Sequence, residues 1–527
     1  MTILDPLPGE FMLSHRITFH CENVPGQERT LTVPAGTRLD VAAALTGFDM
    51  RAHCGGAGTC GKCQLIIKNQ KILACQTSVE SDLDVLVPDA SLRTSEKNVI
   101  VQTGGNAVET TMLRTGHHYG VAVDIGTTTL VAELHDFTGL LPPQIASRAN
   151  PQRKFGDDVI SRIQKVMDTS EALTAMQQFV VGAVNEMTAE LAERNGITSQ
   201  EISIMVVAGN TAMQSLLFGI DPSPLGASPF RAPASEFPAR RGSEIGLTMS
   251  AEGTVEALPI FGGFVGGDIV AGILTLALRK ESGERNAISG QTHFLLDIGT
   301  NGEIVLAHHG TLFTAATAAG PAFEGAKIEH GTLAVPGAID HVKLESGKTT
   351  ISTIGNRPAV GLCGSGLLDA VAVLLEQGII QPNGRFADKQ SHVELVSATA
   401  SGIGEAIVLT QRDIRELQLA AGAIRAGIKL LLQNNDVLPG QIETFFVAGG
   451  FGQSIRLSSA RRIGLLPALP AERFQFCGNT SLAGARAVLL NPKNSEVAHR
   501  LVQQSHHCEL ASLPLFQEIF AESMRLG

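Results

Sequence analysis

The chain has 527 residues, 44% of them hydrophobic, which is enough for two or three domains with proper cores. Its formal net charge of −11 at pH 7 argues against nucleic acid or an anionic membrane as a partner, because both select for basic patches. The N-terminus lacks a basic segment followed by an apolar run, and no apolar stretch in the sequence is long enough to span a bilayer. We therefore expect a cytoplasmic protein.

The cysteines and glycines are unevenly distributed. Four of the eight cysteines are clustered, and the other four are scattered along the chain as ordinary small residues, which suits a reducing compartment better than a disulfide framework. Fifty-six glycines with no Trp and a single Tyr fit a protein built of glycine-rich loops around phosphates better than one built of aromatic recognition surfaces.

Residues 16–45 predict a β-hairpin followed by a helix. Two alternating runs flank a Pro-Gly turn at residues 24–26, and Leu39, Ala43 and Ala44 give the next segment a helical face that packs on the hairpin. Residues 64–68 and 71–74 predict a second hairpin, which turns at Asn69 and Gln70.

The clustered cysteines have the spacing of a four-thiolate site. Five residues separate Cys54 from Cys60, two separate Cys60 from Cys63, and eleven separate Cys63 from Cys75, so three ligands share a tight loop and the fourth returns along a hairpin. The intervening glycines let backbone amides turn toward the sulfurs, which favours an iron–sulfur cluster. Zinc is the alternative, but its usual site has two C-x2-C pairs and this segment has one.

This region, about residues 14–90, resembles the plant-type ferredoxins, whose fold is a β-grasp. The resemblance implies a [2Fe-2S] cluster held by Cys54, Cys60, Cys63 and Cys75. The sequence departs from the photosynthetic ferredoxins in having five residues, where they have four, before the second ligand. Residues 91–118 are polar with little periodicity and are predicted to be a linker, and we expect its paired His117 and His118 to be surface residues.

Two matched hairpins follow the linker. At residues 119–136 an apolar strand delivers Asp124, a tight turn follows and a second strand returns; residues 293–305 repeat the pattern with Asp297. Such turns direct amides and hydroxyls at phosphate while the carboxylate holds Mg2+ through its waters. We therefore predict a duplicated fold with a nucleotide between its halves, in which the turn residues are Gly126, Thr127 and Thr128 in the first copy and Gly299, Thr300, Asn301 and Gly302 in the second.

Three further segments carry small residues at the start of a helix. Residues 201–219 run a buried strand through Gly209, Asn210 and Thr211 into a helix, residues 443–455 pass through Gly449 and Gly450, and residues 478–489 begin a small-residue helix. In sequence order, the two hairpins and these segments resemble the five nucleotide motifs of the actin, sugar-kinase and chaperone ATPase superfamily. The resemblance covers residues 119–527.

The superfamily resemblance implies a duplicated actin-like (ribonuclease H-like) ATPase fold with lobes at about residues 119–290 and 291–527. It implies ATP and Mg2+ as ligands of the two hairpins, Gly449 and Gly450 against the adenosine, and residues 201–219 and 478–489 as the connecting helices at which the lobes hinge. Asp268 and Glu303 are candidate carboxylates for orienting the attacking water, with helix capping or a strand-edge position as the alternative.

Two more glycine-rich runs, residues 317–325 and 361–370, predict loop-to-helix entries whose free amides meet an anion. For Gly364 and Ser365, nucleotide contact and tight packing at a helix start are equally favoured. Residues 150–158, which follow the first hairpin, carry no assigned role.

A one-electron carrier joined to an ATPase indicates that ATP drives an uphill electron transfer. The combination resembles the reductive activators of corrinoid proteins, which implies one-electron reduction of Co(II) to Co(I) in the corrinoid protein of a methyltransferase system and an upstream low-potential electron donor. Homodimerisation is left open. The alternatives are a redox-regulated small-molecule kinase, a non-catalytic redox-sensing or chaperone-like ATP-binding module, and an ATP-driven electron donor to a dehydratase.

Overall fold

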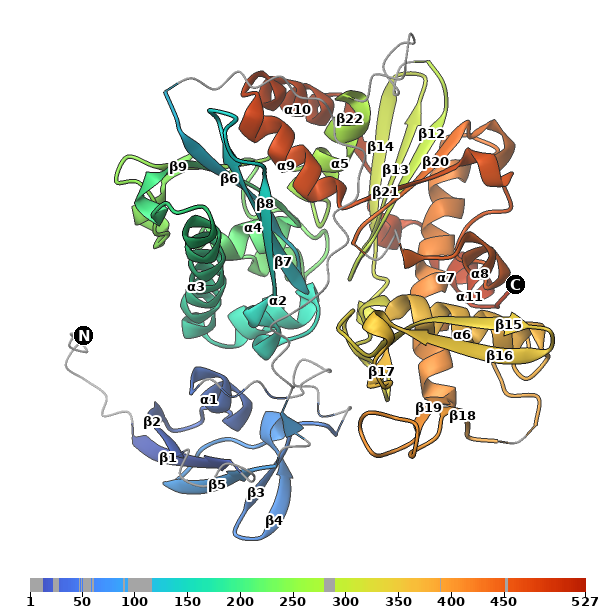
Figure 1. Cartoon of the computed structure of the whole chain (residues 1–527), viewed down its shortest axis with the longest axis horizontal. Helices are drawn as coiled ribbons and strands as arrows, with labels where there is room; N and C mark the ends of the chain where they lie inside the picture. The colour runs from blue at the N-terminus through green and yellow to red at the C-terminus, as the bar shows by residue number, and fades with distance from the viewer. Residues whose placement is uncertain are drawn as a thin grey trace. The chain divides into compact units, whose positions relative to one another are not determined.

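The computed structural model describes residues 13–21, 28–46, 48, 50, 58, 61–88, 91–92, 116–278, 290–388, 390–450 and 454–527. The chain divides into two compact units, one formed by Met1–Ser95 with Lys154–Asp157 and one formed by Glu96–Arg153 and Asp158–Gly527 (Figure 1). None of the described helices combines the length and the apolar character that a membrane span requires.

The N-terminal unit is a five-stranded sheet in the order β2-β1-β5-β3-β4 with one helix packed on it. β1 pairs antiparallel with β2 and parallel with β5, which is the mixed pairing of a β-grasp. Alternate residues of β1, among them Ile17 and Phe19, are fully buried with Leu39 of the helix, as the alternating pattern predicts. The elements are β1 (Ser14–Cys21), β2 (Glu28–Pro34), α1 (Leu39–Leu45), β3 (Gln64–Ile67), β4 (Gln70–Leu73) and β5 (Leu83–Val87).

The second unit contains two six-stranded sheets with the same internal arrangement. Their orders are β10-β11-β9-β6-β7-β8 and β21-β20-β12-β13-β14-β22. In each, the strand before the hairpin turn pairs parallel with a neighbour (β9 or β20), which pairs parallel with a further strand (β11 or β21), and two antiparallel strands lie on the other side. The first sheet has β6 (Tyr119–Ile125), β7 (Thr129–Asp136), β8 (Gln144–Ala149), β9 (Ile202–Gly209), β10 (Arg240–Arg241) and β11 (Thr254–Ala257); the second has β12 (His293–Ile298), β13 (Gly302–His308), β14 (Thr311–Thr317), β20 (Thr444–Ala448), β21 (Phe474–Gly478) and β22 (Ser505–His507).

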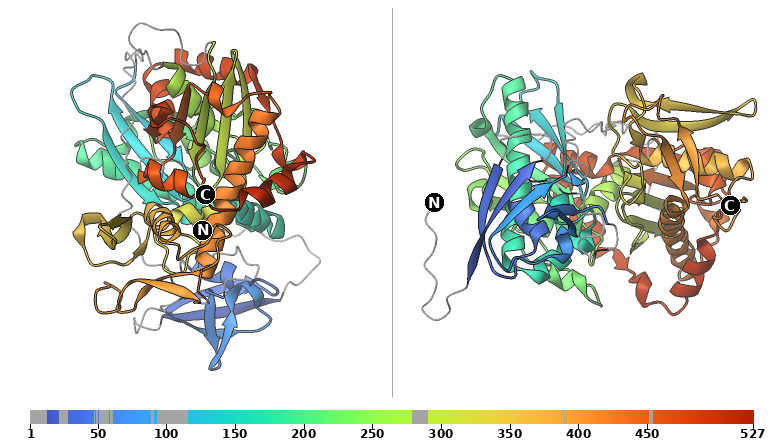
Figure 2. Two further views of the ribbon diagram at one scale, coloured as in Figure 1. Left: turned by 90° about the vertical axis from the view of Figure 1, so that its right-hand side faces the viewer. Right: turned by 90° about the horizontal axis from the view of Figure 1, so that it is seen from below.

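Helices cover both sheets, and this explains the near-continuous apolar runs of the central strands. α7 lies along the strands of the second sheet (Figure 2). The helices are α2 (Val159–Asp168), α3 (Ser170–Arg194), α4 (Thr211–Leu217), α5 (Gly267–Leu278), α6 (Gly364–Glu376), α7 (Gln411–Gln433), α8 (Leu457–Arg462), α9 (Thr480–Leu490), α10 (Lys493–Gln503) and α11 (Phe516–Ser523). Two small sheets complete the second lobe: β15 (Ala338–Glu345), β16 (Lys348–Thr353) and β17 (Gly361–Leu362), and β18 (His392–Val396) with β19 (Ile407–Thr410).

α5 and α9 cross where the two sheets approach each other. A Cβ atom on Gly484 would lie 2.4 Å from the Cα atom of Ala271, so the helices touch backbone to backbone. The Oγ1 of Thr275 also donates a hydrogen bond to the carbonyl of Thr480 across 3.3 Å. The sequence placed the first connecting helix within residues 201–219, but the helix that packs against α9 is α5. That placement was wrong because both helices begin after small residues in the sequence, and only packing distinguishes them.

Candidate functional site

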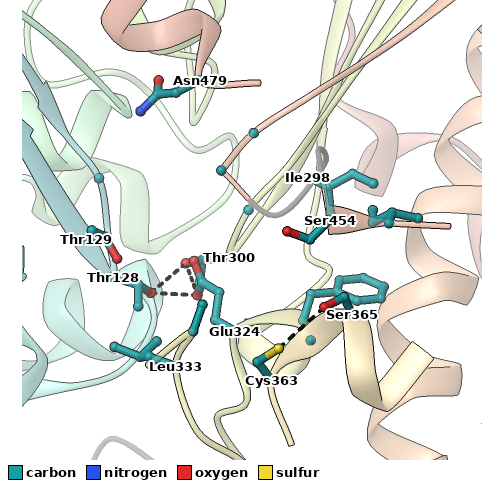
Figure 3. Close-up of a pocket in the computed structure, with 18 of the residues that line it drawn as sticks. Thr128, Thr129, Ile298, Thr300, Glu324, Leu333, Cys363, Ser365, Ser454 and Asn479 are labelled. Atoms are coloured by element: carbon teal, nitrogen blue, oxygen red, sulfur yellow. Dashed lines mark hydrogen bonds between the residues drawn. The ribbon is translucent and has the colours of Figure 1, made fainter. Parts of the chain in front are cut away.

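The turns of the two matched hairpins face a cavity of about 560 Å³ in the second unit. Thr128, from the turn between β6 and β7, and Thr300, from the turn between β12 and β13, approach each other across it (Figure 3). The predicted residues that line it are Asp124, Gly126, Thr127, Thr128, Asn210, Asp268, Asp297, Gly299, Thr300, Asn301, Glu303, Gly364, Ser365, Gly449 and Gly450.

Three predicted residues, Gly209, Thr211 and Gly302, do not line this cavity. A Cβ atom on Gly209 would lie 2.7 Å from the carbonyl oxygen of Ile125, and one on Gly302 would meet Ile424 and Thr317. Thr211 is fully buried. Gly209 and Gly302 thus allow close packing outside the cavity lining.

Asp124, at the end of β6, is held by the beginning of α9. Its Oδ2 accepts a hydrogen bond from the Nδ2 of Asn479, and its Oδ1 accepts one from the Oγ of Ser481, both across 2.8 Å. Asn479 also caps α9, since its Oδ1 accepts the amide of Leu482. The sequence predicted Asp124 but neither partner, because 355 positions separate Asp124 from Asn479.

Four carboxyl groups gather at the floor of the cavity. Desolvation raises the pKa of Asp268 to about 8, with the negative charge of Asp297 as the next cause. Desolvation, together with the charge of Asp124, raises the pKa of Asp297 to about 7. The pKa values of Asp124 and Glu303 are raised for the same principal reason. Carboxyl groups so arranged attract protons or a divalent cation.

The cavity lining is rich in acidic side chains and poor in basic ones. The described residues that line it include six carboxyl groups, one arginine, one histidine and no lysine. A polyphosphate could not enter such a site as a bare anion, because the carboxylates would repel it. The lining therefore favours a phosphate that arrives with a divalent cation.

Glu324 joins the two hairpins. Its Oε2 accepts hydrogen bonds from the Oγ1 of Thr128 across 2.6 Å and from the Oγ1 of Thr300 across 2.7 Å (Figure 3). The sequence predicted that residues 317–325 would offer amides to an anion; the structure brings a carboxylate from this segment into the cavity instead. No local pattern identifies Glu324, because its partners come from both lobes.

Two buried polar side chains, those of Asn150 and Arg162, donate hydrogen bonds to the turn of the first hairpin. The Nδ2 of Asn150 donates to the carbonyl of Gly126 across 2.8 Å, and its backbone amide donates to the carbonyl of Thr128 across 2.7 Å. The Nη2 of Arg162, on α2, donates to the carbonyl of Thr127 across 2.6 Å. Asn150 and Arg162 are both fully buried. Because the C=O of one residue and the N–H of the next point in opposite directions, drawing three carbonyls backward turns the amides that follow them toward the cavity.

The far end of the cavity is built from α6 and the Gly449 loop. Gly449 has a φ of +95°, and a Cβ atom there would lie 2.4 Å from the carbonyl oxygen of Ile298, so only glycine fits. Gly364 and Ser365 line the cavity, whereas a Cβ atom on Gly366 would lie 2.1 Å from the carbonyl oxygen of Ile339. Tight packing at the helix start is thus observed at Gly366, and nucleotide contact by Gly364 and Ser365 stays a prediction.

An ion-paired cluster lies behind this end. Asp369, 1% exposed, has its Oδ2 3.1 Å from the Nδ1 of His341 and 3.4 Å from the Nη1 of Arg456. His341 and Arg456 line the cavity. Neither appeared among the predicted residues, because no sequence motif marks His341, in β15, or Arg456, just before α8.

In the N-terminal unit, two of the four predicted cluster ligands fall within the described residues. Cys63 and Cys75 are both buried, while Cys54 and Cys60 lie outside the described residues. Hydrogen bonds, chiefly with Cys63 and to a smaller extent with Gln76 and the amide of Gly58, lower the pKa of Cys75 to about 6 against the opposing effect of burial. A thiolate with nearby donors is what a cluster ligand requires. His117, in the predicted linker, is half-buried against Ser203, across 2.7 Å, and His118 is exposed.

Three family models match the chain in succession. Residues 22–83 match the 2Fe-2S iron-sulfur cluster binding domain, residues 119–281 match the RACo middle region, and residues 291–527 match the C-terminal domain of RACo, the ASKHA domain. The chain belongs to the RACo family. It therefore carries a domain of the [2Fe-2S] class followed by a domain of the nucleotide-binding ASKHA class, and the fold class predicted from the sequence is confirmed.

Relatives match this RACo chain over most of their length. It is 29% identical to the corrinoid activation enzyme RamQ of Eubacterium limosum, over 93% of this chain and 96% of RamQ. It is 26% identical to the [Co(II) methylated amine-specific corrinoid protein] reductase of Methanosarcina barkeri, over 76% of each. The solved structure of a reductive activator for corrinoid, iron-sulfur protein aligns with a TM-score of 0.70 and 29% identity, covering 97% of this chain and 98% of the other. The resemblance to reductive activators stated from the sequence is thereby confirmed.

Proposed function

We propose that this chain is an ATP-dependent reductive activator that reduces the Co(II) corrinoid of a methyltransferase protein to Co(I). The observation that carries the proposal is the presence in one chain of a thiolate site in a β-grasp unit and a cavity between two matched phosphate hairpins. The names of the relatives, which span almost the same length, support it.

The β-grasp unit would hold a [2Fe-2S] cluster through Cys54, Cys60, Cys63 and Cys75. Of the two described ligands, Cys75 has a lowered pKa, so it is available as the thiolate that iron requires. When bound, the cluster supplies the single electron for the cobalt, and an upstream low-potential donor reduces the cluster again. Each 59 mV of unfavourable potential costs about tenfold in the equilibrium of such a one-electron transfer.

The two lobes would hold MgATP in the cavity. The turn amides and the hydroxyls of Thr128 and Thr300 would bind phosphate, and Asp124 and Asp297 would hold Mg2+ through its waters. The adenosine would lie toward Gly449 and Gly450. ATP bound between lobes stabilises their closed arrangement, which is how its binding free energy shifts the state of a bound partner.

Asp268 and Glu303 are the proposed carboxylates for orienting the water that attacks the terminal phosphate. Both line the cavity. The amide of Ile269 donates to the Oδ1 of Asp268 across 2.8 Å, which fixes this side chain at the beginning of α5. The raised pKa values of both groups mean that each holds a proton tightly when no cation is bound, so either would accept a proton from water only after a bound cation such as Mg2+ had favoured its ionised form.

An anaerobic assay tests the function. The prereduced chain is added, with and without Mg2+ and ATP, to a methyltransferase corrinoid protein in its Co(II) state, and the cobalt absorption is followed. We expect Co(I) to appear only with ATP, to be lost in Cys63→Ser, and to fall about 100-fold in rate in Asp297→Ala.

Two outcomes would contradict the proposal. If several corrinoid proteins gave no Co(I) although the cluster and ATP turnover were intact, the chain would not be an activator. Phosphoryl transfer to a small alcohol under the same conditions would instead identify the kinase considered from the sequence.

A further inference from the structure

We propose that the Glu324 carboxylate holds the place of the terminal phosphate when the nucleotide site is empty, and that ATP binds by displacing it. Glu324 would then determine how strongly the site distinguishes ATP from ADP. The inference rests on the nucleotide site proposed above and goes beyond it by assigning this residue.

The first observation is the geometry around one oxygen atom. The Oε2 of Glu324 accepts a hydrogen bond from Thr128 of the first hairpin and from Thr300 of the second, across 2.6 and 2.7 Å. The two hydroxyl oxygens are 3.4 Å apart. A single anionic oxygen shared by two donors is the arrangement that an oxygen of a phosphate would adopt between the same hydroxyls.

The second observation is that the segment carrying Glu324 is fixed. Phe323, the preceding residue, is 1% exposed and belongs to the core of the second lobe. Gly325, the following residue, has a φ of +78°, and a Cβ atom there would lie 2.5 Å from the carbonyl oxygen of Thr332. The carboxylate is therefore presented by a packed segment whose conformation is restricted on both sides.

The third observation is electrostatic. Glu324 and a terminal phosphate are both anions that use the same two hydroxyls as donors. No lysine lies among the described residues of the lining that would neutralise both at once. Each hydroxyl has one hydrogen to donate and both donate to Glu324, so a phosphate bound to them requires the release of Thr128 and Thr300 from Glu324.

ADP differs from ATP at this point. It lacks the terminal phosphate, so it occupies the rest of the site while Glu324 keeps both hydroxyls. The cost of displacing the carboxylate falls on ATP alone. Removing the carboxylate should therefore strengthen the binding of ATP and leave that of ADP nearly unchanged.

Titration calorimetry on the full chain tests this with Mg2+, ADP and the non-hydrolysable β,γ-imido analogue of ATP. We expect Glu324→Gln to bind the ATP analogue about tenfold more tightly than wild type and to change the affinity for ADP less than twofold. Glu324→Ala, which can accept no hydrogen bond, should give the same sign. Thermal unfolding of each variant verifies that the chain is folded.

Asp340→Asn is the matched control. Asp340 lines the same cavity, but its Oδ1 accepts a hydrogen bond from the Oγ of Ser352 across 2.7 Å and neither threonine contacts it. Loss of its charge should change the affinities for ADP and the ATP analogue by the same factor. An equal effect of Glu324→Gln on both nucleotides would overturn the proposal, because Glu324 would then contribute only to the overall charge of the cavity.

Two further results would test the proposed displacement of Glu324. If Glu324→Gln lost ATP turnover without any change in the affinity for the analogue, Glu324 would be a catalytic residue and the proposed displacement would be wrong. Because these measurements use no corrinoid, normal nucleotide selectivity without Co(I) formation would reject the activator function and leave the assignment of Glu324 standing.

Discussion

The Oγ1 atoms of Thr128 and Thr300 lie 3.4 Å apart, although 172 positions separate the two residues in the chain. One threonine belongs to the first sheet and the other to the second, so the lobes meet at hydroxyl groups that a phosphate would otherwise separate. This approach of the two lobes thus coincides with the proposed position of the terminal phosphate.

The hydrogen bond from Arg162 to the turn of the first hairpin yields the first prediction. Arg162→Met should remove the donor to the carbonyl of Thr127 and loosen the turn that presents amides to phosphate. We expect the affinity for MgADP to fall about tenfold, which corresponds to about 1.4 kcal/mol, and a smaller loss in Arg162→Lys. Calorimetry measures both.

Arg148→Met is the control for Arg162→Met, because Arg148 in the same lobe pairs with Glu190 across 2.7 Å and does not line the cavity. Its affinity for MgADP should equal that of wild type. If Arg162→Met bound nucleotide normally while folded, its hydrogen bond to Thr127 would have no role in positioning the hairpin.

The crossing of α5 and α9 leaves no room for a side chain at Gly484. Gly484→Ala would force its Cβ atom against Ala271, and overpacking of this kind costs about 1–3 kcal/mol in folding free energy. We expect a lower melting temperature by differential scanning calorimetry. Gly182→Ala on α3, where nothing lies within 4 Å of the added atom, should stabilise the chain by up to about 1 kcal/mol, and equal effects at the two sites would show that the crossing is not tightly packed.

The cluster of carboxyl groups predicts how stability depends on pH. The pKa of Asp268 is about 8 in the folded chain and about 3.9 when unfolded, so the folded state binds its proton more tightly. Its contribution to stability is complete below about pH 4 and is lost as the pH rises toward 8, at up to about 1.4 kcal/mol per unit.

The measurement for Asp268 is the melting temperature between pH 5.5 and 8 with EDTA and no nucleotide. The wild type should lose stability across this range more steeply than Asp268→Asn, whose side chain does not titrate. Parallel curves for the two proteins would mean that Asp268 is ionised throughout.

The thiolate site predicts that the cluster can be lost without loss of nucleotide binding. Cys75→Ser should abolish the visible absorption of the cluster and leave the affinity for MgADP unchanged, because the two sites lie in different compact units. Cys477→Ser is the control, since Cys477 is equally buried but lies in β21; it should retain the full absorption. Retained absorption in Cys75→Ser would remove Cys75 from the ligand set.

The sequence predicted those features of the fold and the cavity that are local. A strand followed by Asp124 or Asp297 and a glycine-containing turn is recognisable within a dozen residues, so both hairpins were predicted. The partners of Asp124 on α9, the donor Arg162 and the shared acceptor Glu324 were not, because each meets its partner only through tertiary packing. The first connecting helix was misplaced for the same reason. α4 and α5 both follow small residues, and only the contact of α5 with Gly484 of α9 in the folded chain distinguishes them.

The bond between Asp124 and Asn479 has a consequence for biosynthesis. The strand that carries Asp124 leaves the ribosome 355 residues before its partner, which at about 5–20 residues per second is a delay of roughly 20–70 s. The N-terminal unit is complete well before then, so a nascent chain would have its thiolate site long before its cavity. Premature termination after the N-terminal unit and before α9 would release a protein that keeps the thiolate site and lacks the complete nucleotide cavity.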